Sequence, residues 1–362
     1  MSLNKFDIAV IGSGPGGFNA AVRAAQLGAK VVLVEESFIG GTCLNSGCIP
    51  TKFLWQALKT KQKIQKSYEY GLKTSLERII FSDIIAKKDR NVANIRRGMD
   101  LILASYSINV IKGVASFKDK NSLAISNGEK IVEIFADKII IATGTKPSVM
   151  EGFSFDDIKI INSTGALNLK EMPENMLIIG GGAIGIEMAT IFSGFGSRVT
   201  LAECKNCLLP TENLEVSEEI RKNLSKHGVK VLTACANALD GLDKYEKVLI
   251  VKGRTPNNDL GLENAGVKTI KKGFIRTNEF CQTNIDNIYA VGDIAGKNLL
   301  AYTAQNEGSI SAENVVKGNS IAIENFVIPQ VVFSMPQSSS VKVSDFLNYK
   351  EVAFGKFSFI AS

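Results

Sequence analysis

The sequence contains the same glycine-rich unit twice, with the two copies 168 residues apart. In the first copy, an apolar run at residues 6–11 precedes a G-x-G-x-x-G turn, and a helical pattern at residues 20–27 follows it. A second apolar run then ends on Glu35, eighteen residues after the last glycine of the turn. A strand, a glycine turn, a helix and a second strand that ends on an acid are the fingerprint of a dinucleotide-binding βαβ unit. The repeat therefore predicts an α/β protein with two nucleotide sites, which indicates a flavin donor and a nicotinamide partner.

The three glycines of each turn have different tasks. The first permits a tight bend, the second lets the backbone approach a pyrophosphate, and the third lets the helix pack closely on the sheet. The N-terminus of the helix then faces the phosphate charge. An acid at the ribose prefers the free 2′-hydroxyl of NAD to the 2′-phosphate of NADP, so Glu203 favours NAD. The residues predicted for these tasks are Gly12, Gly14, Gly17 and Glu35 in the first unit, and Gly180, Gly182, Gly185 and Glu203 in the second.

Two cysteines lie between the first unit and the next helical stretch. Cys43 and Cys48 are five residues apart in the string GGTCLNSGCIPTK, which spans residues 40–52. Asn45 and Gly47 allow the backbone to bend between them, so that the two sulfurs can close a small ring. In a reducing compartment, a cysteine pair beside a dinucleotide site indicates catalysis more than structural cross-linking. Two unpaired core cysteines are the alternative.

These motifs, together with GRTPN at residues 253–257 and Gly292-Asp293, closely resemble those of the flavoprotein pyridine nucleotide-disulfide oxidoreductases. Within that family the cysteine string is most similar to the dihydrolipoamide dehydrogenases, and the similarity extends from Phe6 to Phe359. The resemblance implies an α/β fold of two Rossmann-like domains, three-layered around a parallel central sheet, plus an antiparallel meander and a truncated C-terminal interface domain. The implied limits are residues 1–147 with 276–320 for FAD, 148–275 for NAD with a shortened meander, and 321–362 for the interface remnant.

The resemblance also implies a task for each site residue. Cys43 exchanges with dihydrolipoamide, and Cys48 is the thiolate that donates charge to the flavin. Lys52 lies near the flavin and pairs with Glu187, although a salt-bridged surface lysine is the alternative. No metal is expected. The residues expected to bind FAD are Gly12, Gly14, Gly17, Glu35, Lys52, Gly113, Thr143, Gly144, Asp293 and Ala301, and those expected to bind NAD are Gly180, Gly182, Gly185, Glu203 and Gly253.

The sequence departs from this family in its C-terminal part. Family members carry a domain there that forms the dimer and supplies a His-Glu pair, which takes the proton from the dithiol bound at the other subunit. Such a base contributes roughly 10²–10⁴ in rate. The one histidine of this chain, His227, is expected to be a solvated residue at a helix end, and Tyr302 and Met335 stand where the family more often has histidine. We therefore expect either a monomer or a weakened homodimer.

Composition argues against several other classes of protein. The 42 Lys and Arg residues against 36 Asp and Glu leave a net charge of +6 that is spread along the chain, which argues against nucleic-acid binding. No apolar run approaches the roughly 20 residues that span a bilayer. The first residues carry no signal-peptide cleavage pattern, so a cytoplasmic protein is expected. The other cysteines are expected to be structural or incidental, because no second pair follows at zinc-ribbon spacing. They are Cys204, Cys207, Cys235 and Cys281.

Three functions stay open. The leading one is oxidation of dihydrolipoamide by NAD⁺ through a Cys43–Cys48 disulfide and FAD, with the lipoyl domain of a 2-oxo-acid dehydrogenase complex as partner. The second is a shortened NADH-flavin diaphorase, and the third is a catalytically impaired flavoprotein with a binding role. The intact cysteine string and the complete second nucleotide unit favour the first function. The missing His-Glu pair favours the other two.

Overall fold

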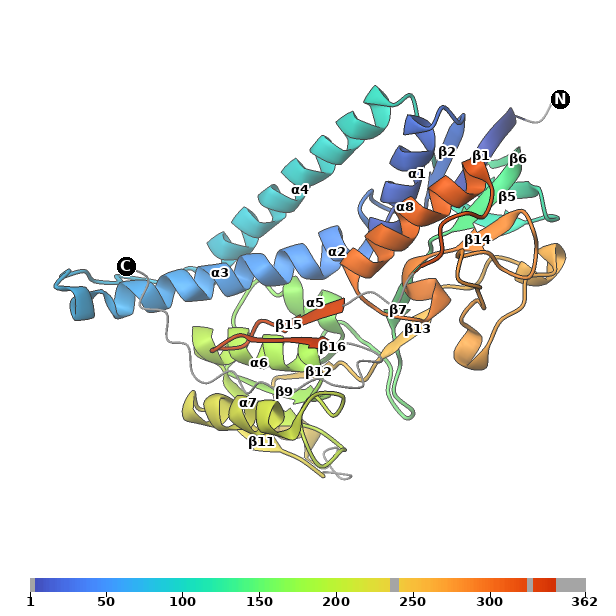
Figure 1. Cartoon of the computed structure of the whole chain (residues 1–362). Coiled ribbons are helices and arrows are strands. Elements are labelled where there is room, and N and C mark those ends of the chain that lie inside the picture. Colours follow the sequence, from blue (N-terminus) through green and yellow to red (C-terminus); the bar gives the residue numbers. More distant parts are fainter. Residues whose placement is uncertain (1–3, 235–240, 324–327, 343–362) are drawn as a thin grey trace, which may run out of the picture.

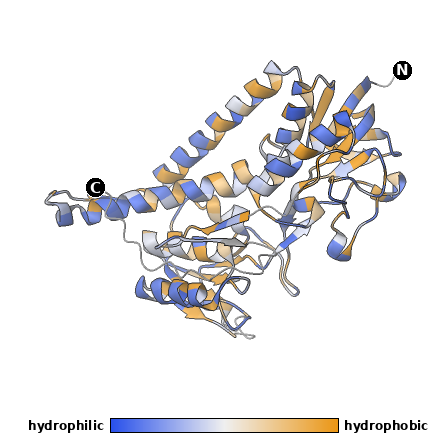
Figure 2. Cartoon of the chain, viewed as in Figure 1, coloured by the Kyte–Doolittle hydropathy of each residue, from blue (hydrophilic) through white to orange (hydrophobic). Residues whose placement is uncertain are grey.

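The computed structural model describes residues 4–234, 241–323 and 328–342. Two α/β domains lie one above the other, each built on its own sheet, and long helices project from them to one side (Figure 1). Hydrophobic residues concentrate on the strands and alternate with hydrophilic residues along the projecting helices, as Figure 2 shows. The α/β architecture with parallel sheets that the sequence predicted is confirmed.

The first sheet is centred on β1 (Asn4–Ile11), which pairs in parallel with β2 (Val31–Glu35) on one side and β6 (Ile131–Ile141) on the other. β3 (Asn109–Lys112) extends the parallel part beyond β2, and β14 (Ile288–Ala290) pairs in parallel with β6. Every residue of β2 is buried. A strand that is covered on both faces has a continuous apolar run in the sequence. This is why apolar and polar residues do not alternate along β2.

An antiparallel extension continues the same sheet. β4 (Val114–Phe117) pairs with β5 (Ser122–Ser126), and β5 pairs with the first half of β6. Short strand-like pieces with glycines between them predict an antiparallel meander at residues 108–135. The meander is present, except that β3 joins the parallel part. Gly113 connects the two parts at a φ of +155°, where an added Cβ would lie 2.7 Å from the Ser126 carbonyl oxygen.

Two helices that are far apart in the sequence pack side by side against this sheet (Figure 1). α1 (Pro15–Gln26) follows β1, and α8 (Ala301–Lys317) follows the short helix η5 (Gly292–Ala295). An added Cβ at Gly308 would lie 2.1 Å from the Gly16 carbonyl oxygen, so only glycine allows this close approach. α8 thus packs directly on α1, the helix that follows the first glycine turn.

The second sheet consists of parallel strands in the order β11-β10-β9-β12-β8. α6 (Ala183–Phe195) follows the second glycine turn, and its residues from Gly185 to Phe192 are all buried. A helix that is apolar all round lies inside a protein rather than on its surface. The other elements of this domain are β8 (Ile160–Ile161), α5 (Ser163–Leu167), β9 (Asn175–Ile179), β10 (Arg198–Ala202), α7 (Leu214–Lys226), β11 (Lys230–Leu232), η2 (Leu242–Lys244) and β12 (Lys247–Ile250).

Two short strands cross between the domains. β7 (Thr145–Pro147) leads into the second domain and β13 (Arg254–Pro256) leads out of it, and the two strands pair antiparallel. After β13 the chain packs on the first sheet again, because Leu260 and Ile275 belong to the buried cluster of that sheet. The sequence placed residues 148–275 in the second domain, and this packing favours a boundary at β13 instead. The returning segment contains η3 (Leu262–Ala265) and η4 (Lys271–Gly273).

The projecting arm consists of α2 (Gly41–Ser46), α3 (Cys48–Gln65), η1 (Ser67–Tyr70) and α4 (Phe81–Ser105). The charged and amphipathic sequence of residues 67–107 predicts one surface helix that packs on the first domain. In the structure α4 begins only at Phe81, and Phe81 and Ile85 lie in the buried cluster of the second domain. Lys88 is buried and donates to the Leu167 carbonyl oxygen at 2.6 Å. Leu103, near the other end of α4, lies in the buried cluster of the first domain, so the arm contacts both domains.

The last described segment is a hairpin of β15 (Ile328–Val332) and β16 (Ser338–Lys342). Val332 lies in the buried cluster of the second domain, and Ser340 Oγ donates to Glu212 at 2.6 Å. The hairpin therefore packs on the second domain. Residues 343–362 of the expected interface remnant lie outside the described residues. Within the described ranges, no helix combines the length and apolarity that a membrane span requires.

Candidate active site

Cys43 and Cys48 lie on either side of a break between two helices. Cys43 belongs to α2, and Cys48 is the first residue of α3. Gly47 separates the helices, and an added Cβ there would lie 2.9 Å from a carbonyl oxygen of α2. Asn45 holds the turn by donating to the Gly41 carbonyl oxygen at 2.9 Å. The predicted bend between the cysteines is present, and it brings the two sulfurs close together without a bond between them.

The two sulfurs share a hydrogen bond, and this bond separates their pKa values. The Cys43 thiol donates to the Cys48 sulfur, which holds the pKa of Cys43 far above its ordinary value and lowers the pKa of Cys48 to about 7. Burial opposes the change at Cys48, and the positive charge of Lys52 adds to it. At neutral pH Cys48 is therefore partly ionised while Cys43 stays protonated. The thiolate, which is the reactive form of a cysteine, forms on Cys48.

Lys52 stands one helical turn after Cys48 and forms an ion pair across the domain boundary. Its Nζ lies 3.1 Å from Oε2 and 3.2 Å from Oε1 of Glu187 in α6. The Phe333 ring covers the same ammonium group, with 4.2 Å between Nζ and the ring centroid, and the Phe333 N–H donates to Glu187 Oε1 at 3.2 Å. Trp55 meets this ring edge-on, with 5.6 Å between the centroids. The ion pair is the one that the resemblance implied.

Asp293 follows β14 and lies in η5. Thr145 Oγ1 donates to Asp293 Oδ2 at 2.7 Å, and Arg254 Nε lies 3.8 Å from the same carboxylate oxygen. Arg254 also donates to Thr145 Oγ1 and to the Thr145 carbonyl oxygen, both at 2.6 Å. Burial lowers the pKa of Arg254, and the negative charges of Asp293 and Cys48 oppose this effect. These side chains are therefore within electrostatic reach of the dithiol, at the point where the crossing strands β7 and β13 meet.

Tyr302, at the start of α8, lies near the same pair of sulfurs. Burial raises its pKa, and the negative charge of Cys48 adds to the rise. Its hydroxyl donates to the Pro329 carbonyl oxygen of β15. The residue that stands where the family more often has histidine thus connects the helix beside the dithiol to the C-terminal hairpin.

The first glycine turn has the geometry that a pyrophosphate requires. An added Cβ at Gly17 would lie 1.8 Å from the Gly12 carbonyl oxygen, and one at Gly12, whose φ is +93°, would lie 2.5 Å from the Ala142 carbonyl oxygen. The Cβ position of Gly14, by contrast, has no atom within 4 Å. Gly14 is the N-cap of α1, and this helix has neither a side-chain cap nor an acid in its first turn. The end of α1 is therefore open to an anionic group.

Glu35 lies at the end of β2, directly beside this turn. It accepts hydrogen bonds from the Ser13 N–H at 2.8 Å, from Ser13 Oγ at 2.6 Å and from the Ser37 N–H at 2.9 Å. These bonds fix the acid against the turn. An open pocket nearby is lined by Glu36, Lys112, Gly113, Val114 and residues 126–129. The pocket leaves room beside Gly113, which the sequence placed near FAD.

Thr143 and Gly144 follow β6 at the same edge of the sheet. Thr143 Oγ1 donates to the Asn257 carbonyl oxygen at 2.7 Å, and Asn257 Nδ2 donates to the Thr143 carbonyl oxygen at 2.9 Å. Gly144 has a φ of +66°, and Ala301 is the first residue of α8. Asp293 likewise follows a parallel strand. The carboxyl ends of parallel strands meet at one edge, where α/β proteins bind their ligands.

The second glycine turn repeats the first. An added Cβ at Gly185 would lie 1.9 Å from the Gly180 carbonyl oxygen, and the Cβ position of Gly182 has no atom within 4 Å. Gly182 is the N-cap of α6, which also has no side-chain cap and no acid in its first turn. Glu203, at the end of β10, accepts a hydrogen bond from the Gly181 N–H at 2.6 Å. The acid is thus tied to the turn as in the first unit.

The structure places most of the predicted residues at or after the carboxyl ends of strands. Those expected for FAD belong to the first sheet, except Lys52 in α3 and Ala301 at the start of α8. Those expected for NAD belong to the second sheet, and the dithiol lies near the Lys52–Glu187 ion pair. Gly253, with a φ of +123°, directly precedes β13 at the crossing. Sequence reasoning missed Phe333 and Thr145, for which the sequence held no signal. It also gave no task to Arg254, although this residue belongs to the quoted GRTPN string.

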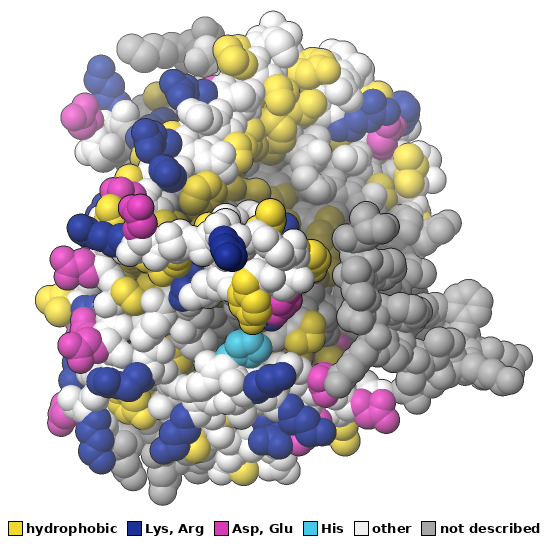
Figure 3. Space-filling view, turned by 90° about the vertical axis from the view of Figure 1, so that its left-hand side faces the viewer, with side chains coloured by type: hydrophobic (Ala, Val, Ile, Leu, Met, Phe, Trp, Pro, Cys, Tyr) yellow, Lys and Arg dark blue, Asp and Glu magenta, His cyan; other side chains and the backbone are white. Residues whose placement is uncertain are grey.

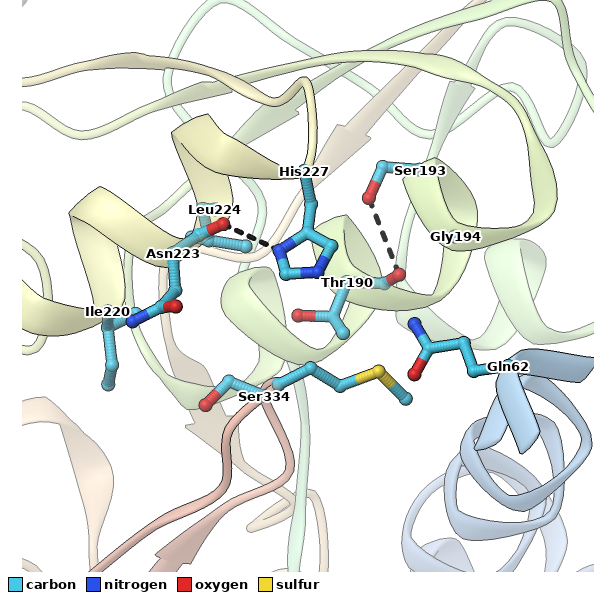
Figure 4. Close-up of a pocket in the computed structure, with 10 residues that line it drawn as sticks. Gln62, Thr190, Ser193, Gly194, Ile220, Asn223, Leu224, His227 and Ser334 are labelled. Carbon is cyan, nitrogen blue, oxygen red and sulfur yellow. Dashed lines mark hydrogen bonds between the residues drawn. The ribbon is translucent and has the colours of Figure 1, made fainter. Parts of the chain in front are cut away.

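The single histidine of the sequence is exposed at the surface (Figure 3). His227 follows the last residue of α7, and its Nδ1 shares a 2.8 Å hydrogen bond with the Asn223 carbonyl oxygen. It lines a small pocket with Gln62, Ser193 and Met335 (Figure 4). The prediction of an exposed residue at a helix end is confirmed. On the face in Figure 3, basic and acidic side chains are interspersed rather than separated by sign.

The other cysteines differ in their surroundings. Cys281 is buried, and burial raises its pKa far above the ordinary value. Cys204 is exposed and Cys207 is half-buried, while Cys235 lies outside the described residues. In the part of the chain that the structure describes, no three His, Cys, Asp or Glu side chains form a group that could hold a metal ion.

These features define a class of protein: a two-domain reductase in which a dithiol lies between two dinucleotide-binding turns. The profile of the pyridine nucleotide-disulphide oxidoreductases matches residues 6–308, and the chain belongs to this family. It is 39% identical over 353 residues to the dihydrolipoyl dehydrogenase of Geobacillus stearothermophilus, which covers 92% of this chain and 74% of that protein. It is 37% identical over 355 residues to the dihydrolipoyl dehydrogenase of Chlamydia muridarum, which covers 94% of this chain and 76% of that protein.

A solved structure has the same fold. The copper(II) complex of RclA, an HOCl-induced flavoprotein disulfide reductase from Escherichia coli, superimposes with a TM-score of 0.81 at 30% sequence identity, over 94% of this chain and 77% of that one. The chain is therefore a dihydrolipoyl dehydrogenase-like flavoprotein disulfide oxidoreductase. The dihydrolipoyl dehydrogenases use FAD and NAD(H) as cofactors.

Proposed function

We propose that this chain oxidises a dihydrolipoyl dithiol with NAD⁺, through a Cys43–Cys48 disulfide and FAD. The observation that carries the proposal is the separation of tasks between the two sulfurs. Cys48 forms a thiolate near Lys52, and Cys43 stays protonated. The relatives that are named dihydrolipoyl dehydrogenase support the substrate class.

The exchange with substrate begins from the oxidised pair. A substrate thiolate attacks Sγ of Cys43, the bond between the two sulfurs breaks, and Cys48 leaves as a thiolate. The positive charge of Lys52 favours Cys48 as the leaving group, because it stabilises the developing thiolate. The second substrate sulfur then attacks the sulfur that is bound to Cys43, which closes the substrate disulfide and releases Cys43. Cys43 keeps one of the two substrate protons because its pKa is raised, and the other proton goes to solvent.

The first glycine turn fits FAD, since the end of α1 is open and the Cβ position of Gly14 is free. When bound, FAD supplies a two-electron acceptor for the dithiol and a donor for NAD⁺. We propose that Glu35 binds the adenosine ribose and that Asp293 binds the ribityl chain. Lys52 holds a positive charge beside the thiolate, and Glu187 orients it.

The second glycine turn fits NAD for the same two reasons, at Gly182 and α6. We propose that Glu203 binds the adenosine ribose there. Its carboxylate would repel a 2′-phosphate, which favours NAD over NADP. We also propose that the substrate is carried by the lipoyl domain of a 2-oxo-acid dehydrogenase complex in the cytoplasm. A homodimer is proposed from the resemblance to the family alone.

The test is an anaerobic titration of the FAD-loaded chain with NADH, followed by assay of dihydrolipoamide oxidation by NAD⁺. We expect a long-wavelength absorbance band from the Cys48 thiolate beside the flavin. Cys43→Ser should lower dihydrolipoamide turnover by about 10³-fold or more, because the substrate then has no sulfur to attack. NADH oxidation by an artificial acceptor should persist in Cys43→Ser, since that route does not use the disulfide.

Dihydrolipoamide turnover that survives Cys43→Ser would exclude the proposal. If the native chain oxidises NADH with artificial acceptors but never turns over dihydrolipoamide, the protein is a diaphorase. If it binds FAD and shows neither activity, a binding role is the better description.

A further inference from the structure

The loop after β10 carries a second pair of cysteines, at the rim of the turn proposed for NAD. Cys204 directly follows Glu203, and Cys207 lies three residues further on. Cys204 is exposed, and Lys252 Nζ donates a hydrogen bond to its Sγ at 2.8 Å. Reactive cysteines have partly exposed and electropositive surroundings. Cys204 has both features, and the catalytic proposal gives it no task.

The loop that carries these cysteines also fixes the second glycine turn. Glu203 Oε2 accepts from the Gly181 N–H at 2.6 Å, and the Leu209 N–H donates to the Gly181 carbonyl oxygen at 3.0 Å. Leu208 is fully buried, and an added Cβ at Gly181 would lie 2.6 Å from its Cδ2. Both cysteines lie between these anchor points. A change of shape in the loop therefore reaches the turn that faces the pyrophosphate.

Lys252 connects this loop to the segment on the other side of the turn. It directly follows Val251, whose carbonyl oxygen would lie 2.6 Å from an added Cβ at Gly180. The bond from Lys252 to Cys204 thus joins the two segments that enclose the turn. Loss of the Cys204 thiol would release this connection.

The two thiols are close enough along the chain to form a disulfide. The backbone bends at every residue from 204 to 207. Cysteines with two residues between them form disulfides in Cys-X-X-Cys motifs. A disulfide needs a Cα separation of roughly 4.4–6.8 Å. Ring closure therefore requires only a local rearrangement inside this loop.

We propose that Cys204 and Cys207 form a second dithiol, separate from the catalytic pair, whose oxidation lowers the affinity of the second glycine turn for NAD(H). The oxidant is a small disulfide such as glutathione disulfide. Cys204 attacks one of its sulfurs and releases one glutathione, and Cys207 then attacks Cys204 and releases the second. Two protein thiols become one disulfide, and their protons pass to the two glutathione thiolates. The inference rests on the proposed function only in assigning NAD(H) to this turn.

The test uses the FAD-loaded chain, isolated with its catalytic pair oxidised and then treated with glutathione disulfide. Lys205 lies between the two cysteines, so trypsin separates residues 199–205 from residues 206–221 unless a disulfide joins them. Mass spectrometry should find the joined peptides. Calorimetry should show that the Kd for NAD⁺ rises about tenfold or more, which corresponds to about 1.4 kcal/mol or more. Mild reduction with dithiothreitol should reverse both changes.

Matched variants separate this site from the catalytic pair. Cys204→Ser and Cys207→Ser should each bind NAD⁺ but lose both responses to glutathione disulfide, and Lys252→Met should form the joined peptides more slowly. Absence of the joined peptides, or their formation with unchanged NAD⁺ affinity, would overturn the proposal. A reduced chain that binds no NAD⁺ would contradict the assignment of the second turn, and with it the regulatory half of this inference. The joined peptides would still decide whether the dithiol exists.

Discussion

Phe333 lies over the ammonium group of Lys52, with 4.2 Å between the ring centroid and Nζ. The same residue donates its backbone N–H to Glu187, the ion-pair partner of Lys52. One residue of the C-terminal hairpin segment thus contacts both members of the pair that stands beside the dithiol. A cation over an aromatic face gains about 0.5–2 kcal/mol, which is enough to orient a lysine side chain.

Phe333→Leu should therefore displace the Lys52 ammonium group and raise the pKa of Cys48, because less positive charge then stabilises the thiolate. The measurement is the pH midpoint of the long-wavelength absorbance in the two-electron-reduced, FAD-loaded chain. Phe333→Tyr keeps the ring and should restore the native midpoint. If Phe333→Leu has the native midpoint while its thermal stability falls, the ring is only a packing residue.

The lowered pKa of Cys48 predicts how the dithiol form depends on pH. Folding lowers the pKa of Cys48, so ionisation of this thiol stabilises the reduced fold. The contribution is fully present above the ordinary thiol pKa of 9.0 and is lost as the pH falls through about 7. We expect the thiolate absorbance to disappear with a midpoint near pH 7. The difference in melting temperature between the reduced native chain and reduced Cys48→Ser should shrink over the same range. A thiolate midpoint that stays near the ordinary thiol value of 9.0 would contradict the assignment of the hydrogen bond.

Lys52→Met should raise that midpoint by roughly one unit or more, since an opposite charge at 4–6 Å lowers a pKa by about 1–3 units. Lys59→Met is the matched control, because Lys59 lies on the same helix but contacts the Trp55 ring instead. The same absorbance titration compares the two variants. Equal midpoints in both would show that Lys52 does not act on the thiolate.

A Gly→Ala substitution in one glycine turn should abolish nucleotide binding at that turn and leave the other turn intact. Gly17→Ala places Cβ 1.8 Å from a carbonyl oxygen and should give a colourless protein, whereas Gly185→Ala should keep FAD and lose NAD⁺ binding. Gly98→Ala is the control, because no atom lies within 4 Å of its Cβ position. In the interior of α4 it should stabilise the chain by about 0.5–1 kcal/mol. Flavin absorbance tests Gly17→Ala, calorimetry with NAD⁺ tests Gly185→Ala, and thermal unfolding tests Gly98→Ala. A yellow Gly17→Ala protein would argue against the first turn as the flavin site.

Glu203→Gln should weaken the preference for NAD over NADP by about tenfold, or about 1.4 kcal/mol, because the amide no longer repels a 2′-phosphate. The amide oxygen can still accept from the Gly181 N–H, so the turn should keep its shape. The ratio of the dissociation constants for NADP⁺ and NAD⁺ is the measurement. Glu215→Gln, on the exposed first turn of α7, should leave the ratio unchanged.

Sequence reasoning was most complete where an arrangement is local. The glycine turns and the bend between the two cysteines depend on residues within a few positions of one another, and their backbone requirements are written in consecutive residues. It was least complete in the arm, where the helix predicted from residue 67 begins at Phe81 and packs on both domains. Amphipathic periodicity shows that a helix has a buried face, but it does not show which domain covers that face.

The sequence by itself determined the two dinucleotide-binding units, the cysteine string and the acid that follows each unit, because short-range sterics and spacing specify them. Only the tertiary structure decided which residue covers Lys52, which domains the arm packs on and which loop holds the second turn. The physical reason is that these properties arise from burial and from charges that are distant in the chain. Lys52 and Glu187 are 135 positions apart, and Glu187 and Phe333 are 146 positions apart, yet together they surround one ammonium group.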